Sequence, residues 1–401
     1  MWILDVARVP RWMVAAAIAA SLWSVNRAAP DPRVEIRVDC HDPADCALAT
    51  TYALDIWSEQ TGPDLPLDLV VRGSSLAALA DAHVAFEIMS SDIDADARVE
   101  AARLAHDGSS DFFADYRDYA AIVEHMRGLA ALDPDRVAME AIGVSLEGRP
   151  IWALKIGHGP TKVLVNGTEH AREWISTMVS ISLADRMVRG IATDPRVREL
   201  VATSTLWVVP VMNPDGYQFT WGTDRYWRKN RRGRFGVDLN RNWGVAWGGA
   251  GASKNKAAET YRGEYAFSEP ETQALRNLAK REHFALHVDF HAFSQLILYP
   301  WGWTAKPAED HARFAGVGDK MASAMFAQHG VNYRLMQSVA LYPASGTMTD
   351  WMYGEGGALS YTIELRPKAG PRNGFVLPPS QIRPTSDEAF AALLELRASL
   401  P

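Results

Sequence analysis

Short apolar runs of strand length alternate with longer helical stretches from about Asp111 onward, and this alternation constrains the fold more than any other feature. Six of the runs predict strands: 151–156, 162–165, 206–211, 285–290, 296–299 and 361–365. The helical stretches lie at 119–132, 173–189, 269–282, 308–328 and 386–399. Strands interleaved with helices are typical of an α/β fold, in which a mainly parallel or mixed sheet lies between helices. At 401 residues, with 48% apolar and 22% charged, the chain can bury a sizeable core.

The first quarter of the chain follows a different pattern. Strands are predicted at 34–39, 54–58, 67–71 and 84–89, with short helices at 42–52 and from Ser74 to Ala82. A turn at Gly62-Pro63 joins the two middle strands. The resulting order, β-α-β-β-α-β, is that of a small ferredoxin-like α+β domain.

Residues 90–110 are polar and charged, and they predict a linker between this small domain and the larger one. Arg98 and Arg103 within the linker would be accessible to a trypsin-like protease. We therefore expect a small domain with its linker over 31–107 and a larger domain over 108–401.

Charge is distributed unevenly between the two parts. Residues 31–108 hold 16 acidic residues against five arginines and no lysine, a net charge of −11, although the whole chain carries only −7. An acidic block beside a slightly basic one suggests that the first covers a positive cleft in the second, but a solvated acidic surface would explain the same composition. The two cysteines of the chain, Cys40 and Cys46, lie in the acidic block; they either pair or stay free, and they define no redox compartment.

The N-terminus predicts a targeting segment. Arg8 and Arg11 precede a largely apolar run over 12–25, which is too short to span a bilayer comfortably and fits the core of a signal peptide. We expect residues 1–29 to be a signal peptide, and the mature protein to be extracellular or periplasmic. Asp5 is atypical of such segments, and an uncleaved anchor is the main alternative.

One of the 11 histidines begins a His-x-x-Glu motif, His170 to Glu173, directly after a predicted strand and its turn. His291 also follows a predicted strand, whereas His287 falls within it. In α/β proteins, metal ligands and catalytic groups gather where strands end. Two imidazoles and one carboxylate would leave a coordination position open, as in catalytic zinc sites. The alternative is a polar loop with Glu173 near a helix N-terminus, where a carboxylate is favoured anyway.

Nine segments then identify a family. They are Glu147 to Ile151, His170 to Trp174, Asn213 to Gly216, Trp227 to Lys229, Asp238 to Trp243, Glu259 to Tyr261, His291 to Pro300, Tyr342 to Gly346 and Tyr361 to Arg366. In order and spacing, these segments make residues 115–399 resemble the catalytic domain of the carboxypeptidase A/B family of zinc metallocarboxypeptidases. The resemblance implies a mixed, twisted, eight-stranded sheet between helices, preceded by an inhibitory pro-domain.

By this resemblance, one zinc ion is bound by His170, Glu173 and His291. Glu364 takes the place of the general base, which accepts a proton from the attacking water. Arg228 takes the place of the cation that stabilises charge on the scissile carbonyl oxygen. Without the resemblance, Glu364 would be read as a surface residue, and Arg228 as part of a solvated basic run. The near-neutral charge of the larger domain argues against a nucleic-acid partner.

Substrate recognition is also implied by the resemblance. Asn240 and Arg241 match the group that holds the free C-terminal carboxylate, which a planar guanidinium can bind by paired hydrogen bonds. Tyr342 matches the tyrosine that closes over the bound residue, and Arg172 matches a further arginine of the cleft. Without the resemblance, Asn240, Arg241 and Tyr342 could be ordinary loop residues.

Thr349 matches the floor of the specificity pocket, where a carboxylate would suit Lys or Arg side chains. The other matching positions, Leu298, Gly302, Leu341 and Ala344, are apolar or small, and Gln337 replaces a common aliphatic residue. This pocket favours apolar or aromatic C-terminal residues, or a broad preference. Asp289 allows two interpretations, because it could face the pocket and attract a basic side chain or could support the metal ligand His291 from behind.

We therefore expect a secreted zinc carboxypeptidase that acts on peptide and protein C-termini and is made as a precursor. Its predicted partners are an activating protease and the substrate, with no nucleic acid, no stable membrane association and a monomeric state. The activating cut is expected between about Asp96 and Ser110. Two rivals remain: a zinc deacylase acting on N-acyl amino acids, and a catalytically inactive peptide-binding module.

Overall fold

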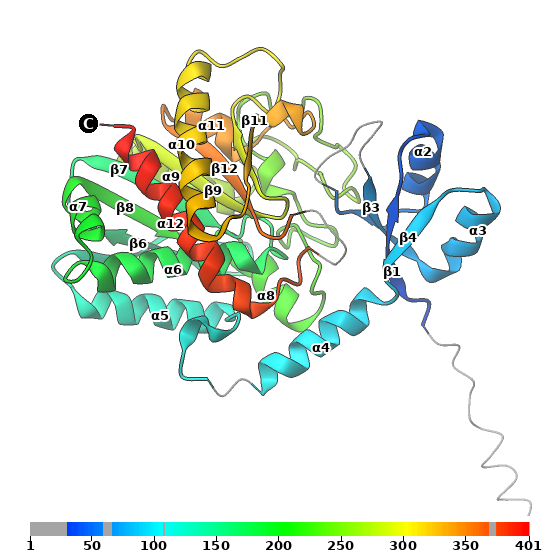
Figure 1. The fold of residues 1–401 in the computed structure, drawn as a ribbon, viewed down its shortest axis with the longest axis horizontal. Coiled ribbons are helices and arrows are strands. Elements are labelled where there is room, and N and C mark those ends of the chain that lie inside the picture. Colours follow the sequence, from blue (N-terminus) through cyan, green and yellow to red (C-terminus); the bar gives the residue numbers. More distant parts are fainter. Residues whose placement is uncertain (1–29, 59–65, 107–108, 369–373, 401) are drawn as a thin grey trace, which may run out of the picture.

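The structure is a computed structural model that describes residues 30–58, 66–106, 109–368 and 374–400. A small domain lies beside a larger one, and a helix connects them along the lower edge of the view in Figure 1. The predicted signal peptide and the Gly62-Pro63 turn lie outside the described residues.

The small domain contains a four-stranded antiparallel sheet in the order β2-β3-β1-β4. Its elements are β1 (Arg33–Val38), α2 (Pro43–Thr51), β2 (Asp55–Ile56), β3 (Leu67–Arg72), α3 (Leu76–Asp81) and β4 (Phe86–Ser90). The predicted ferredoxin-like order is confirmed. Ile36, Leu69 and Leu79 are fully buried in its core. Cys40 and Cys46 form a disulfide that ties the end of β1 to the first turn of α2.

The segment over 90–110, where we expect a linker, does connect the two domains, but most of it is a helix, α4 (Ile93–Ala105). The Asp92 side chain accepts a hydrogen bond from the Ala95 N–H and caps the helix, and acidic residues in the first turn and Arg103 in the last suit its dipole. Ile93 and Glu100 are buried against the rest of the molecule. The polar composition therefore reflects an amphipathic helix packed on one face rather than a free segment.

The larger domain is built on an eight-stranded sheet in the order β11-β10-β12-β9-β7-β8-β6-β5. The strands are β5 (Val137–Val144), β6 (Pro150–Ile156), β7 (Thr161–Gly167), β8 (Ser204–Val209), β9 (Leu286–Ala292), β10 (Leu296–Tyr299), β11 (Arg334–Gln337) and β12 (Leu359–Leu365). The central pairs β12-β9, β9-β7 and β7-β8 are parallel, whereas β10-β12, β8-β6 and β6-β5 are antiparallel. The predicted mixed α/β sheet is confirmed.

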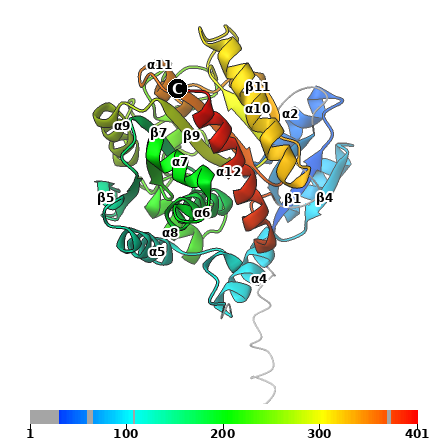
Figure 2. The same cartoon turned by 60° about the vertical axis from the view of Figure 1, so that its left-hand side comes forward.

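Helices cover both faces of this sheet (Figures 1 and 2). They are α5 (Tyr119–Leu132), α6 (Trp174–Gly190), α7 (Pro195–Thr203), α8 (Pro214–Gly222), α9 (Pro270–Glu282), α10 (His311–His329), α11 (Met348–Gly354) and α12 (Ile382–Ala398). Alternate strand residues enter two separate cores, as the period of a strand requires. On β7, Val163 and Val165 pack with α5, α6, α10 and α12, whereas Leu164 packs with α9 and α11.

Some elements of the larger domain are not predicted from the sequence. Both edge strands, β5 and β11, were missed, as were α7, α8 and α11. The register of β5 shifts between Ala141 and Gly143, which interrupts its alternation, and β11 has only four residues. Short elements and edge strands carry a weak periodic signal, so their formation depends on neighbours supplied by the rest of the fold.

The sheet brings three strand ends together. Since β7, β9 and β12 are adjacent and parallel, their C-terminal ends meet at one edge of the sheet. His291 near the end of β9 pairs in register with Glu364 near the end of β12. The loop that follows β7 carries His170. Three predicted site residues therefore reach one place from distant parts of the sequence.

Candidate metal centre and substrate cleft

A short loop between β7 and α6 positions His170 and Glu173. Thr168 adopts a positive φ of 61°, its N–H donates to Ser176 Oγ, and its hydroxyl donates to the Pro210 carbonyl. The Ala171 N–H donates to the Arg228 carbonyl, which ties this loop to the segment that carries Arg228. Because these bonds hold both sides of the loop, His170 and Glu173 are fixed relative to the sheet.

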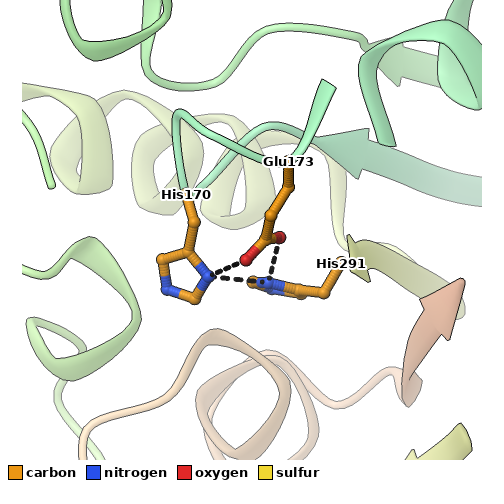
Figure 3. Close-up of side chains that lie close together, drawn as sticks. All are labelled: His170, Glu173 and His291. Carbon is orange, nitrogen blue, oxygen red and sulfur yellow. Dashed lines mark hydrogen bonds and ion pairs between the residues drawn. The ribbon is translucent and has the colours of Figure 1, made fainter. Parts of the chain in front are cut away.

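Figure 3 shows how His170, Glu173 and His291 converge. His170 Nδ1 lies 2.8 Å from Glu173 Oε1 and 3.0 Å from His291 Nδ1, and His291 Nδ1 lies 3.1 Å from Glu173 Oε2. All three residues are buried. Glu173 directly precedes α6, but its side chain makes no capping bond to the helix and turns to the two imidazoles instead. The alternative of a simple helix-terminal carboxylate therefore does not describe it.

The other nitrogen of each imidazole contacts an aspartate. His170 Nε2 lies 3.2 Å from Asp238 Oδ1, and His291 Nε2 lies 2.9 Å from Asp289 Oδ2. Burial alone would raise the pKa of Asp238, but Arg228 and His170 hold it well below its usual range. Burial would likewise lower the pKa of His291, but Asp289 and Glu173 raise it well above its usual range. The site therefore favours positive charge at its centre.

These donors fit a zinc ion. Tetrahedral zinc with bonds of about 2.0–2.1 Å to nitrogen and oxygen places its ligand atoms about 3.3 Å apart, and the observed separations of 2.8–3.1 Å are close to this value. Two imidazoles backed by carboxylates, with a third carboxylate between them, form the electron-rich set that zinc prefers. Three protein ligands leave one position open for catalysis.

Two further polar residues border this centre. Arg228 is 7% exposed, and its Nη2 donates to Asp238 Oδ2 over 3.1 Å, so the aspartate behind His170 also orients this guanidinium. Glu364 is 6% exposed and lies opposite His291 on the neighbouring strand. The structure thus brings the predicted base and the predicted oxyanion-stabilising residue to the same place as the three candidate ligands.

A cavity of about 670 Å³ opens beside this centre. Arg172, Arg228, Arg241 and Tyr342 of the larger domain line it. Arg241 is held by its Nε–H, which donates to the Gly251 carbonyl over 2.9 Å, and its guanidinium carbon lies 5.8 Å from the centre of the Tyr342 ring. Three guanidinium groups and a tyrosine around one cavity can bind an anionic group.

The opposite wall of the cavity belongs to the small domain. Thr50, Ala53, Leu54, Asp55, Ile56 and Ser58 line it. Asp55 Oδ2 accepts hydrogen bonds from Arg172 Nη1 and from Trp57 Nε1. The Asp55 carboxylate of the small domain is therefore paired with the Arg172 guanidinium of the cleft.

The predicted specificity pocket is apolar with a hydroxyl pair at its floor. Leu298 and Leu341 pack in one small cluster. Thr349 is 3% exposed, and its Oγ1 lies 2.5 Å from Thr362 Oγ1. The Gln337 side-chain amide donates to the Trp301 and Thr304 carbonyls, so its polar end is bound to backbone. One acidic residue reaches the pocket wall, because the Gly302 N–H donates to the buried Asp350 carboxyl group over 3.0 Å.

The pocket-facing interpretation of Asp289 is wrong. This residue is fully buried, and its two oxygens contact Asn166 Nδ2 and His291 Nε2. Since both oxygens are engaged behind His291, the side chain cannot meet a substrate. Its second interpretation, support of His291, agrees with this position.

Asn240 connects the centre with the pocket. Its Nδ2 lies 3.4 Å from His291 Nε2, and its Oδ1 accepts from the Met348 N–H. Met348 directly precedes Thr349, so this bond fixes the start of α11, which carries the pocket floor.

Sequence reasoning gave no role to several residues of this site. Asp238 lies inside the family segment Asp238 to Trp243, Glu169 directly precedes His170, and Asn166 is the second-to-last residue of β7. Their proximity to the motif was the available signal. No local sequence signal pointed to Asp55, because its contact with Arg172 joins residues 117 positions apart.

Comparison with known proteins now decides the family. The profile of the zinc carboxypeptidase family matches residues 122–392. The chain belongs to this family. Rat carboxypeptidase A1 is 34% identical to this zinc carboxypeptidase in an alignment of 363 positions that covers 86% of each chain.

Solved structures of related proteins agree with this zinc carboxypeptidase in fold. The crystal structure of thrombin activatable fibrinolysis inhibitor matches with a TM-score of 0.84 and 27% identity, over 91% of this chain and 98% of that one. Carboxypeptidase A from Helicoverpa armigera matches with a TM-score of 0.82 and 27% identity, over 92% and 98% of the two chains. The chain is thus a metallocarboxypeptidase of the carboxypeptidase A-like exopeptidases.

Proposed function

We propose that this zinc carboxypeptidase binds one zinc ion through His170, Glu173 and His291, removes single residues from the C-termini of peptides and proteins, and is made as an inactive secreted precursor. The observation that carries the proposal is the convergence of three ligand atoms, 2.8–3.1 Å apart, beside Glu364 and next to a cavity lined by arginines.

The residues around the metal have separate roles in peptide hydrolysis. Bound zinc would act as a Lewis acid toward the scissile carbonyl and the attacking water. Glu364 accepts a proton from this water and later returns it to the leaving amine. Arg228, held by Asp238, donates hydrogen bonds to the carbonyl oxygen as negative charge develops on it. The protein forms no covalent bond to the substrate in this scheme.

Exopeptidase activity requires recognition of a free carboxylate. Arg241 and Asn240 supply it, since a fixed guanidinium and an amide can hold both oxygens by hydrogen bonds. Tyr342 beside Arg241 covers the bound residue, and Arg172 binds farther along the cleft. The hydroxyl floor at Thr349 and the apolar walls favour apolar or aromatic C-terminal residues, or a broad preference.

The small domain acts as an inhibitory pro-domain in this proposal. Among the residues that the structure describes, four ion pairs join it and α4 to the larger domain: Asp55–Arg172, Glu100–Arg225, Arg33–Asp224 and Arg103–Asp115. The small-domain partner is acidic in two of these pairs and basic in the other two, so the overall acidity of the domain is not what holds it. The pair that matters for activity is Asp55–Arg172, because it places a carboxylate in the cleft that substrate must enter.

Proteolysis would have to act on α4. We propose the precursor boundaries 1–29 for the signal peptide, 31–107 for the pro-domain with its activation segment, and 108–401 for the catalytic domain. Of the candidate arginines, Arg98 is the more accessible, with 69% of its side chain exposed against 36% for Arg103, which is paired with Asp115. Since both arginines are helical, α4 must unwind locally before a protease can cut it.

Export rests on the N-terminal sequence, which lies outside the described residues. Within the described part of the chain, no helix is both long and apolar enough to cross a bilayer. A disulfide between Cys40 and Cys46 is consistent with an oxidising compartment. Fractionation of the native host, with sequencing of the mature N-terminus, tests this part of the proposal.

A release assay tests the function. The trimmed and the intact protein are given blocked dipeptides that end in Phe, Leu, Lys, Arg or Glu, each as free acid and as amide, with and without a zinc chelator. We expect chelator-sensitive release from free acids only, fastest for Phe and Leu, and much slower release by the intact protein. Equal activity of intact and trimmed protein would refute the precursor proposal.

Three other outcomes would change the assignment. Release from amidated substrates at the same rate would contradict the role of Asn240 and Arg241. Hydrolysis of N-acyl amino acids, without release from dipeptides, would favour the deacylase. A protein that binds zinc and peptides but releases nothing would be the inactive binding module.

A further inference from the structure

A buried chain of polar side chains runs from His291 into the centre of the sheet. Asn166 on β7, His287 and Asp289 on β9, and Ser360 on β12 are all 0% exposed. Asn166 pairs in register with Asp289, and Ser360 pairs with His287, so the chain crosses three adjacent parallel strands. Such strands normally carry apolar residues at their centre, and a polar group is costly there unless it is hydrogen-bonded.

Neighbouring members of this series are joined by hydrogen bonds of 2.6–2.9 Å. His291 Nε2 lies 2.9 Å from Asp289 Oδ2, and Asn166 Nδ2 donates to Asp289 Oδ1 over 2.6 Å. His287 Nε2 lies 2.8 Å from Asn166 Oδ1, and His287 Nδ1 lies 2.7 Å from Ser360 Oγ. These bonds therefore connect the candidate zinc ligand His291 on β9 with Ser360 on the neighbouring strand β12, by way of Asn166 on β7.

The donor and acceptor of each hydrogen bond in this series can be assigned. Because Asn166 turns its NH₂ group to Asp289, its carbonyl oxygen faces His287, which must donate from Nε2. Burial lowers the pKa of His287 to about 4, so its ring is neutral at neutral pH and its Nδ1 accepts from the Ser360 hydroxyl. Each donor thus points toward Asp289.

The same reasoning shows which nitrogen of His291 keeps its proton. The carboxylate of Asp289 already accepts from Asn166, and its second oxygen accepts from His291 Nε2–H. Asn240 Nδ2, 3.4 Å from the same nitrogen, is itself a donor and cannot accept this proton. When zinc binds, His291 must give up its second proton; with Nε2–H held by Asp289, that proton leaves from Nδ1, the nitrogen that faces His170 and Glu173.

A second carboxyl group lies beside this contact. Glu169 Oε2 lies 3.5 Å from His291 Nε2, and Glu169 Oε1 accepts from Trp243 Nε1 over 2.9 Å. Glu169, Asp289 and His291 are all buried and offer polar atoms within 4.8 Å of one another. Glu169 therefore lies beside the same imidazole nitrogen that Asp289 holds.

We propose that Asp289 and Glu169, held in place by Asn166, His287 and Ser360, are positioning residues that keep His291 in the tautomer that presents Nδ1 to zinc and so increase the affinity of the site for the metal. This inference rests on the proposed zinc function of His291. It deepens that function by assigning a task to residues that touch neither substrate nor metal.

Zinc affinity of the full chain tests the proposal. The dissociation constant is measured by competition with a chelator of known affinity for wild type, Asp289→Asn, Asn166→Ala and the double variant. We expect Asp289→Asn to weaken zinc binding by about 10- to 100-fold. Asn166→Ala should weaken it less, and the double variant should bind about as weakly as Asp289→Asn alone, because both residues act through one contact.

A matched control is available on α6. Asp185 Oδ1 lies 2.8 Å from His125 Nε2, which is the same kind of Asp–His contact remote from the candidate ligands. Asp185→Asn should leave zinc affinity unchanged. A 15N spectrum of histidine-labelled wild-type protein loaded with zinc should show His291 bound through Nδ1 with a proton on Nε2, and this measurement needs no variant that could fail to fold.

The outcomes separate this proposal from the function. Zinc binding by wild type with equal affinity in Asp289→Asn, or ligation through His291 Nε2, would overturn the inference and leave the carboxypeptidase assignment intact. An equal loss in Asp185→Asn would also overturn it, because the effect would then be one of general stability. Failure of the wild-type chain to bind zinc would overturn both.

Discussion

Replacement of Asp55 by alanine in the uncut precursor should release activity without proteolysis. Asp55 Oδ2 accepts from Arg172 and from Trp57, and the Asp55 and Arg172 side chains are only 15% and 2% exposed. Arg172 would keep its contacts with the Tyr226 carbonyl and with the Phe375 ring, whose centre lies 4.3 Å from its guanidinium carbon. The variant therefore removes one charge-assisted contact across the cleft and leaves the arginine in place; the bonds from Trp57 Nε1 and the Ile56 N–H that it also removes lie within the small domain.

The size of the effect follows from this single contact. A hydrogen bond between charged groups stabilises by about 1.5–3 kcal/mol, and each 1.4 kcal/mol is about a factor of ten in an equilibrium. Opening of the cleft should therefore become roughly 10- to 100-fold more frequent. While the closed form still dominates, the basal activity of the uncut protein should rise by the same factor.

The assay compares initial rates of release from a free-acid dipeptide by uncut wild type, Asp55→Ala and Asp81→Asn. Asp81 is an exposed aspartate on α3 and controls for the loss of one negative charge from the small domain. After trypsin trimming, all three proteins should be equally active. An uncut Asp55→Ala protein no more active than wild type would refute the argument that this carboxylate keeps the cleft closed.

Three further predictions concern the larger domain. Glu364→Gln should lower kcat by about 10²- to 10⁴-fold, while metal analysis shows unchanged zinc content. Thr349→Asp should shift the ratio of kcat/KM for C-terminal Lys over Phe by about tenfold or more toward Lys, since it places a carboxylate at the pocket floor; an unchanged ratio would place the floor elsewhere. Burial raises the pKa of Asp350 from 3.8 to about 7, so the folded protein retains a proton that the unfolded chain releases near pH 4. Stability should therefore fall as pH rises from about 4 to 7, and urea unfolding of Asp350→Asn should show a shallower decline over this range.

Features governed by local sequence could be predicted. Alternation of strands and helices, the β-α-β-β-α-β order of the small domain and the placement of His170 and His291 at strand ends all follow from periodicity and turn residues close in the chain. The resemblance to a family added Glu364, Arg228 and Arg241, whose local sequence alone would have suggested surface or basic-loop residues.

Local sequence misled where a segment's role depends on its packing. The polar stretch over 90–110 resembles a linker until Ile93 and Glu100 are seen buried against the larger domain. β5 and β11 are strands because β6 and β10 supply their hydrogen-bond partners.

The tertiary structure alone decided which long-range pairs form. From the sequence, Asp289 lies two residues before His291, and its side chain could face the pocket or the metal ligand. The fold buries this side chain between Asn166 and His291. The contact of Asp55 with Arg172 joins two domains, and no periodicity encodes it. The physical reason is that secondary structure depends on neighbours within a few residues, whereas hydrogen bonds and ion pairs in a buried site depend on which strands the sheet places side by side.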